Sequence, residues 1–190
     1  MPRLFTGIEL PHLVRERLGG LRAPLPGARW IEPENLHITL RFAGDVDNLV
    51  ATEFSHALAA IDQDAFEIRI TGLGAFGGNS PRLLWAGVAT GPALGALARA
   101  NERAARAAGL EPEGRAFKPH VTLARFQHAR AEALARFLEG RGAFSSEPFV
   151  VERFVLFSSR PKMGGGPYVV EQAFPLNGAN GHEIDPGADW

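Results

Sequence analysis

The chain has 190 residues, of which 45% are hydrophobic, so it can form one globular domain or two small lobes that share a core. Its formal net charge of −1 excludes a general basic surface for duplex nucleic acid, and the absence of cysteine excludes disulfides, thiolate zinc sites and a cysteine nucleophile. No stretch reaches the roughly 20 apolar residues of a membrane span. We therefore expect a cytoplasmic protein, monomeric, with no membrane partner and no duplex DNA partner.

The first half of the chain alternates between patterns of period two, which predict strands, and apolar residues three or four apart, which predict helices. In chain order, these patterns predict a strand at 3–10, a helix at 11–18, a short edge strand at 30–31, a strand at 36–42, a helix at 47–61 and a strand at 66–70. Glycines are frequent from Gly72 to Pro81, and this segment is predicted to be a loop.

The second half repeats this order of elements. The same patterns predict a strand at 83–88, a helix at 92–108, strands at 117–125 and 147–157 with a helix at 129–139 between them, and a last strand at 168–174. Gly164–Gly166 fits a hairpin turn or a flap, and the polar tail 177–190 is predicted to be disordered. Because strands do not alternate strictly with helices, we expect an α+β protein of mostly antiparallel sheet, built from two similar halves.

Two tetrapeptides carry the functional argument, His37-Ile38-Thr39-Leu40 and His120-Val121-Thr122-Leu123. Side chains alternate along a strand, so in each copy the imidazole and the threonine hydroxyl share one face while the aliphatic residues share the other. Two strands with the same order of residues predict two equivalent elements that face a common substrate.

A pair of histidines suits the displacement of a phosphodiester. An unperturbed imidazole has a pKa of about 6.5, so one copy can be neutral and act as a base while the other is protonated and acts as an acid. The base takes a proton from the attacking water or hydroxyl, and the acid protonates the leaving alkoxide. Hydroxyls of Thr39 and Thr122 can donate hydrogen bonds to the non-bridging oxygens.

Metal-dependent and serine-dependent chemistry are the alternatives at this stage. A zinc site needs three protein ligands, and neither motif has a further His, Asp or Glu at a spacing that reaches the same face. A serine nucleophile would sit in a Gly-x-Ser-x-Gly turn, which the chain lacks. We expect neither a metal nor another cofactor.

The two motifs and their flanks resemble the two-histidine phosphoesterase superfamily, and within it the bacterial and archaeal RNA 2',3'-cyclic phosphodiesterases, also described as 2'-5' RNA ligases. The resemblance covers residues 3–176, with a weaker match after Phe157, and is carried mainly by the segments Arg3–Ile8, Pro33–Phe42 and Phe117–Arg125. It implies one bilobal domain over 1–176, with outer helices, one His-x-Thr motif in each lobe and a cleft between the lobes.

The resemblance also implies an activity: hydrolysis of 2',3'-cyclic phosphate at the end of RNA or a nucleotide, giving a 2'-phosphomonoester without a metal. His37 would be the acid that protonates O3' and His120 the base that activates water, although the pseudo-symmetry lets the two roles exchange. Thr39 and Thr122 would hold the phosphoryl oxygens, and Arg125 is the candidate phosphate clamp.

Strand parity decides which further residues can reach the substrate. Lys118 and Arg41 lie at even offsets from their histidines, so they share the catalytic face if the strands are regular. Arg125 lies at an odd offset from His120 and reaches that face only if the strand bulges or ends before it. Trp30, Phe42, Phe126 and Tyr168 are candidate platforms for base stacking.

Three alternative functions share these residues: a module that binds nucleotides or RNA ends without turnover, a hydrolase of another phosphodiester such as a 2'-5' linkage or a cyclic ADP-ribose phosphate, and an RNA ligase that runs the reaction in reverse. The histidines handle the phosphate and not the rest of the ligand, so they do not separate these alternatives.

Overall fold

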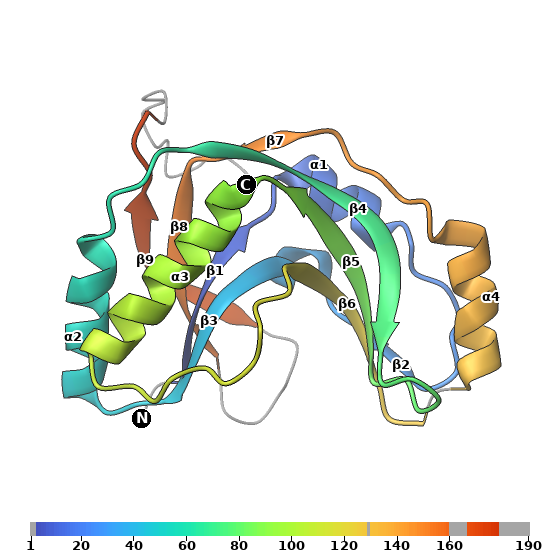
Figure 1. The fold of residues 1–190 in the computed structure, drawn as a ribbon. Coiled ribbons are helices and arrows are strands. Elements are labelled where there is room, and N and C mark those ends of the chain that lie inside the picture. Colours follow the sequence, from blue (N-terminus) through green and yellow to red (C-terminus); the bar gives the residue numbers. More distant parts are fainter. Residues whose placement is uncertain (1–2, 129, 160–166, 179–190) are drawn as a thin grey trace.

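The structure, a computed structural model, describes residues 3–128, 130–159 and 167–178 (Figure 1). Its elements, in chain order, are β1 (Arg3–Glu9), α1 (His12–Gly19), β2 (Ala28–Trp30), the 3₁₀ turn η1 (Pro33–Asn35), β3 (His37–Asp45), α2 (Asn48–Ala59), β4 (Phe66–Phe76), β5 (Leu83–Thr90), α3 (Pro92–Ala107), β6 (His120–Phe126), α4 (Ala131–Arg141), β7 (Phe149–Val151), β8 (Arg153–Ser159) and β9 (Tyr168–Pro175).

All named strands belong to one antiparallel sheet with the order β7-β4-β5-β6-β3-β1-β8-β9, and β2 pairs with β6. The sheet arches over the molecule, with α2 and α3 on one side and α4 on the other (Figure 1). The two motif strands, β3 and β6, are neighbours at its centre and pair through Ile38 and Val121. Both residues are completely buried. Since neighbouring side chains of a strand point to opposite faces, the histidine that precedes each of them faces away from this core.

The two halves of the chain have the same order of elements and interlock. Elements β1-α1-β3-α2-β4 correspond to β5-α3-β6-α4-β8. Each lobe combines strands from both halves of the chain, because β8 of the second half pairs with β1 of the first, and β4 of the first half pairs with β5 of the second. Helix α3, which belongs to the second half, likewise packs on α2 and β3 of the first half. The predicted α+β fold with two pseudo-symmetric lobes is confirmed.

The predicted loop at Gly72–Pro81 is wrong for residues 72–76, and the loop is confirmed only from Gly77 to Pro81. Strand β4 continues to Phe76, through a register shift between Ile70 and Leu73 where Gly72 has a φ of +71°. Gly74 lies under the ring of Trp85, and a Cβ there would stand 2.3 Å from the indole. These glycines permit a bulge and a close aromatic contact within a strand, whereas the sequence pattern alone suggested a turn.

The predicted single strand at 147–157 is also wrong, because it is two strands divided at Glu152. Strand β7 pairs with β4 at one edge of the sheet, and β8 pairs with β1 near the other. The edges approach each other here: Asp64, before β4, forms a bridge with Asn177, after β9. The chain can therefore pass from one edge to the other within a few residues, which curls the sheet toward a barrel.

Two predictions fall at least partly outside the described residues. The glycine run 164–166 lies outside them, as do residues 179–190 of the predicted tail. The division into a domain at 1–176 and a tail stays a prediction. In the part of the chain that the structure describes, none of the helices has both the length and the apolar character needed to cross a membrane.

Candidate active site

The histidines of the two motifs are held in the same way. In each ring Nδ1 lies against the backbone carbonyl oxygen two residues earlier, Asn35 O at 2.8 Å from His37 and Lys118 O at 2.6 Å from His120. A carbonyl oxygen only accepts, so Nδ1 carries the hydrogen and donates it. In both neutral rings the lone pair is therefore on Nε2, the atom left to exchange protons with a substrate.

The threonine of the first motif already contacts its histidine. Thr39 Oγ1 lies 3.1 Å from His37 Nε2, and because this nitrogen carries a lone pair, the hydroxyl donates to it. Thr122 stands on β6 opposite Trp85 of β5, with its side chain half-buried on the same face as His120. Both motif faces thus present an imidazole nitrogen and a hydroxyl side by side.

Each motif ends in a bulge at its leucine. Thr39 pairs with Gly7 but Arg41 pairs with Thr6, which leaves Leu40 as the extra residue of β3. In β6, Thr122 pairs with Trp85 and Ala124 with Leu84, which leaves Leu123 extra. One extra residue reverses the alternation, so the side chains at odd offsets beyond the bulge share the face of the histidine.

Arg41 is consequently not on the catalytic face, and the prediction that it shares that face is corrected. Its side chain is buried, and its guanidinium is occupied by the Glu102 carboxylate and by the carbonyl oxygens of Phe42 and Glu111. It ties β3 to α3 and to the segment that follows α3. Ala124, its equivalent in the other repeat, is buried as well.

The same bulge turns Arg125 toward the catalytic face. Its positive charge is close enough to His37 to lower the pKa of that imidazole, as does His120, so the three side chains share one electrostatic environment. Lys118 is exposed at the start of β6 and lines the same cavity as His120. His37, His120 and Arg125 therefore lie together on two neighbouring strands from opposite halves, and Lys118 lies beside the cavity that His120 borders.

An aromatic wall surrounds His37. The rings of Phe5, Phe157 and Tyr168 have centroids 5.0, 5.5 and 5.0 Å from the imidazole centroid. Burial by this wall is the largest cause that lowers the pKa of His37, to about 4. The neighbouring Arg125 and His120 lower it further, while the hydrogen bond to Asn35 O opposes this effect. His37 is therefore neutral at pH 7 in the free protein.

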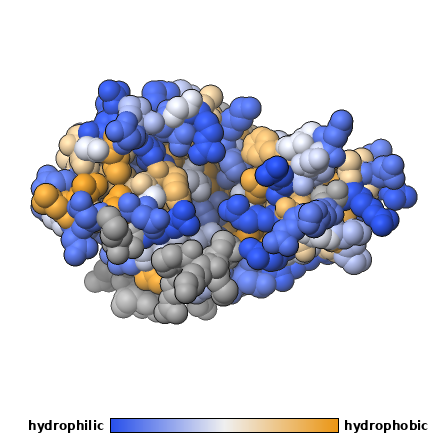
Figure 2. All heavy atoms as spheres, turned by 90° about the horizontal axis from the view of Figure 1, so that it is seen from below, coloured by the Kyte–Doolittle hydropathy of each residue, from blue (hydrophilic) through white to orange (hydrophobic). Residues whose placement is uncertain are grey.

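The surroundings of His120 are more open. It borders a cavity of about 830 Å³, and Phe76 meets its ring edge-on with centroids 5.3 Å apart. Viewed from below, the molecule is recessed between its two lobes (Figure 2). The other aromatic or charged residues in the wall of this cavity are Arg41, Phe42, Arg99, Glu102, Glu113, Arg115, Phe117 and Lys118.

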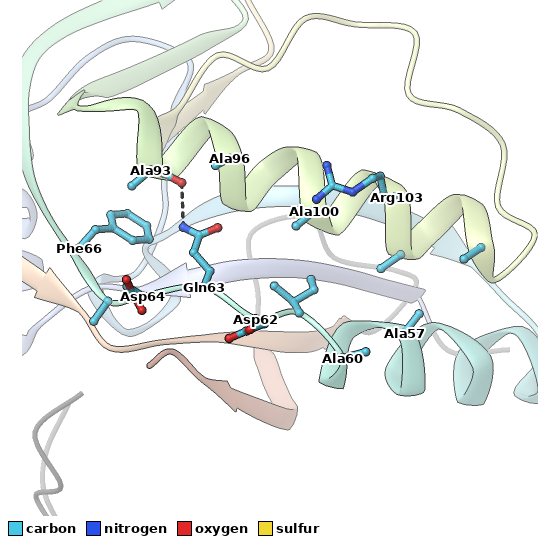
Figure 3. A pocket seen from close by; sticks show the side chains of 14 residues that line it. Ala57, Ala60, Asp62, Gln63, Asp64, Phe66, Ala93, Ala96, Ala100 and Arg103 are labelled. Carbon is cyan, nitrogen blue, oxygen red and sulfur yellow. Dashed lines mark hydrogen bonds between the residues drawn. The ribbon is translucent and has the colours of Figure 1, made fainter. Parts of the chain in front are cut away.

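A second cavity, of about 810 Å³, lies between α2 and α3 and contains no residue of either motif. Its wall is mostly alanine, with Asp62, Asp64 and Arg103 at the edges, and Gln63 Nε2 donates a 3.0 Å hydrogen bond to Ala93 O (Figure 3). The residues that line it include no histidine, serine, threonine or cysteine. Among the described residues, no three His, Asp or Glu side chains are grouped so that they could hold a metal ion.

A family model described as the 2'-5' RNA ligase superfamily matches residues 10–162. The chain belongs to this superfamily. An RNA 2',3'-cyclic phosphodiesterase of Aquifex aeolicus is 33% identical over 79% of the chain and 82% of its own length. One from Aeropyrum pernix is 44% identical over 59% of the chain and 65% of its own length. The structure of Escherichia coli LigT complexed with 3'-AMP has a TM-score of 0.76 at 25% identity, covering 93% of this chain and 99% of that one.

The family resemblance predicted from the two motifs is confirmed. The matches cover the relatives unevenly: the chain spans 65% of the Aeropyrum pernix protein and 52% of that from Geobacillus stearothermophilus. Members of the superfamily with this fold have been solved with nucleotides, since LigT was also crystallised in complexes with ATP and NADP+.

Sequence reasoning missed the aromatic wall around His37. Phe5 and Phe157 come from β1 and β8, which pair with each other across 152 positions of sequence, Phe5 directly opposite Phe157. The superfamily match at Arg3–Ile8 and around Phe157 includes these residues, and Tyr168 was predicted as a stacking platform, but no pattern placed the three rings around His37. Trp30, a predicted stacking platform, instead contacts Phe137 and donates from Nε1 to Ala23 O at 3.1 Å, so it is a packing residue between β2 and α4.

Proposed function

We propose that this protein is a metal-independent phosphodiesterase that hydrolyses 2',3'-cyclic phosphate at the ends of RNA or nucleotides to 2'-phosphomonoesters. The observation that carries the proposal is the duplicated site, in which His37 and His120 each donate from Nδ1 to a backbone carbonyl and keep Nε2 for the substrate. The names of the relatives, RNA 2',3'-cyclic phosphodiesterases, support the same activity.

In this proposal His120 is the base and His37 the acid. His120 Nε2 takes a proton from water, whose oxygen forms a bond to phosphorus, while the bond from phosphorus to O3' breaks and His37 Nε2 protonates O3'. Thr39 and Thr122 donate hydrogen bonds to the non-bridging oxygens. Arg125 and Lys118 offset the negative charge that builds up on the phosphoryl group.

The lowered pKa of His37 fits this assignment once the substrate is bound. In the free protein His37 is neutral, because burial and the nearby guanidinium of Arg125 oppose its protonation. A phosphate anion beside Nε2 favours the protonated form, since an opposite charge raises the pKa of an imidazole. The proton that O3' needs therefore reaches His37 only when the substrate fills the site.

The nucleoside is proposed to lie in the cavity beside His120. Phe42 and Phe117 line this cavity and are 42% and 38% exposed, which is unusual for phenylalanine and leaves ring surface for a nucleobase. Phe42 is turned inward by the same type of bulge as Arg125, because it holds the equivalent position five residues after its histidine. We further propose that the protein works as a monomer in the cytoplasm.

Incubation with a 2',3'-cyclic mononucleotide tests the function. The expected product is the 2'-phosphomonoester alone, identified by phosphorus NMR, with a rate that EDTA leaves unchanged. A 3'-phosphate product, or loss of the activity on chelation, would contradict the proposed mechanism.

The alternatives give different results in the same assay. A pure binding module would hold the cyclic nucleotide without consuming it, and a 2'-5' hydrolase would prefer a 2'-5'-linked dinucleotide. Joining of a cyclic-phosphate RNA end to an RNA with a 5'-hydroxyl, at high concentration of both, would show the reverse reaction.

A further inference from the structure

A third cavity, of about 880 Å³, is lined by Arg125 and by none of the residues that line the cavity beside His120. Besides Arg125 it is lined by Arg29, Arg82 and His128, with Ser80 and Gln127 as further polar groups. None of the described residues in its wall is acidic. A concave surface with this composition attracts anions, because the positive charges of its arginines add.

The sheet places two of these arginines directly opposite each other. Arg29 of β2 pairs with Arg125 of β6, and Leu83 of β5 pairs with Arg125 from the other side. Arg82 comes just before Leu83, and its carbonyl oxygen accepts from Phe126 N at 3.0 Å. Like charges at paired positions of neighbouring strands destabilise a sheet. An anion bound between them would contact both guanidinium groups.

Arg125 also connects this cavity to the catalytic histidines. Its charge lowers the pKa of His37, and its side chain lines the cavity of Arg29 and Arg82. A substrate whose reactive phosphate lies between the histidines therefore has the cavity within reach of its next charged group. A cyclic mononucleotide has no such group, because its single phosphate is the one that reacts.

We propose that the cavity formed by Arg29, Arg82, Arg125 and His128 binds a second phosphate of the substrate, so that phosphate-extended RNA ends are preferred to cyclic mononucleotides. This rests on the proposed function and names its substrate class. The arginines hold a phosphodiester through charge-assisted hydrogen bonds. The cavity carries no base-reading geometry, so the preference concerns the number of phosphates and not the sequence.

The test compares kcat/KM for three substrates: a 2',3'-cyclic mononucleotide with a 5'-hydroxyl, the same nucleotide with a 5'-phosphate, and a trinucleotide that ends in 2',3'-cyclic phosphate. In the Arg82→Ala variant, we expect the ratio of trinucleotide to 5'-hydroxyl mononucleotide to fall about tenfold, since a charge-assisted contact is lost. The salt dependence of the trinucleotide reaction should weaken by about 0.7 in logarithmic slope, the value for one phosphate contact on a single strand.

Arg69→Ala is the matched control. Arg69 is an exposed arginine of β4 and lines none of the three cavities described here, so its loss should leave the ratio unchanged. A 5'-phosphate mononucleotide that behaves like the trinucleotide would show that the bound phosphate is that of the terminal nucleotide. If only the trinucleotide responds, the phosphate belongs to the next linkage.

The failures are distinguishable. If the wild-type protein hydrolyses the mononucleotide and the trinucleotide with equal efficiency, or if Arg82→Ala and Arg69→Ala give the same ratio, the second-phosphate site is wrong while the phosphodiesterase stands. If the wild-type protein hydrolyses none of the three substrates, the proposed function is wrong and the inference falls with it.

Discussion

At the scale of single residues, the two imidazoles have equivalent hydrogen bonds but different surroundings. Replacing either one should lower the rate, because one supplies the base and the other the acid. We expect His37→Ala and His120→Ala each to lower kcat for a 2',3'-cyclic nucleotide by at least about a hundredfold, because each removes one proton transfer. Circular dichroism should show that both variants remain folded. Near wild-type turnover in either variant would contradict the two-histidine mechanism.

A substrate with a better leaving group separates the two roles. An aryl phosphodiester releases 4-nitrophenolate, which needs no proton as it departs, so it does not need the acid. His37→Ala should therefore recover much of its activity on this substrate, whereas His120→Ala should not. The opposite result would exchange the roles of the two residues.

The lowered pKa of His37 sets the acid limit of activity. The active pair of histidines carries one proton in total, so uptake of a second proton removes the base. Because the pKa of His37 is about 4, kcat/KM should fall near pH 4, well below the 6.5 of an ordinary histidine. Arg125→Gln removes a positive charge that lowers this pKa, so its acid limit should move to higher pH. An acid limit that stays in place in Arg125→Gln would contradict the electrostatic coupling.

The free energy of unfolding must be followed in the same experiment, because the lowered pKa of His37 also makes the stability of the fold depend on pH. The unfolded chain takes up a proton on this residue near pH 6.5, but the folded protein does so only near pH 4. Between these values the unfolded state binds more protons, so the free energy of unfolding falls as the pH falls through this window. Circular dichroism at each pH separates loss of the fold from titration of the site.

At the scale of elements, the close approach of β1 to β3 positions the first motif. A Cβ on Gly7 would stand 2.7 Å from Ile38 O and 3.2 Å from the Phe157 ring, so Gly7→Ala must push β3 away or shift the aromatic wall. We expect a loss of about 1–3 kcal/mol in the free energy of unfolding, as for other overpacked sites, together with a lower kcat. Urea denaturation and the cyclic nucleotide assay measure the two effects.

Gly114→Ala is the control for that substitution, since nothing lies within 4 Å of a Cβ at position 114. It changes the unfolded chain in the same way without a clash, so it should be neutral or slightly stabilising. Equal effects of the two variants would show that the close approach at Gly7 has no special importance.

The elements also show what sequence reasoning could reach. Period-two alternation predicted the motif strands and the shared face of His37 and Thr39, because a regular strand fixes that geometry. It could not place the bulges at Leu40 and Leu123, since one extra residue leaves no mark on composition. Because of these bulges, Arg125 faces the site and Arg41 does not. The aromatic wall could not be predicted either, because it depends on the pairing of strands from the two ends of the chain.

At the scale of the whole molecule, the exchange of elements makes each half depend on the other. Strand β1 needs β8, β4 needs β5, and the buried side of α3, including Leu94 and Leu97, packs into the lobe of the first repeat. A chain divided in the turn between β4 and β5, into residues 1–79 and 80–190, should therefore give two fragments that do not unfold cooperatively on their own. Each would leave a large apolar surface in water.

Co-expression of the two fragments is the matched control, because it restores every contact except one peptide bond. We expect the pair to copurify, to unfold cooperatively in circular dichroism and to regain hydrolysis of the cyclic nucleotide, since His37 and His120 are then brought back to neighbouring strands. If either fragment alone shows a cooperative transition, that half of the chain is stable without the other. The interlocked sheet would then be a later association of two stable units, in which each repeat could have folded before the shared site existed.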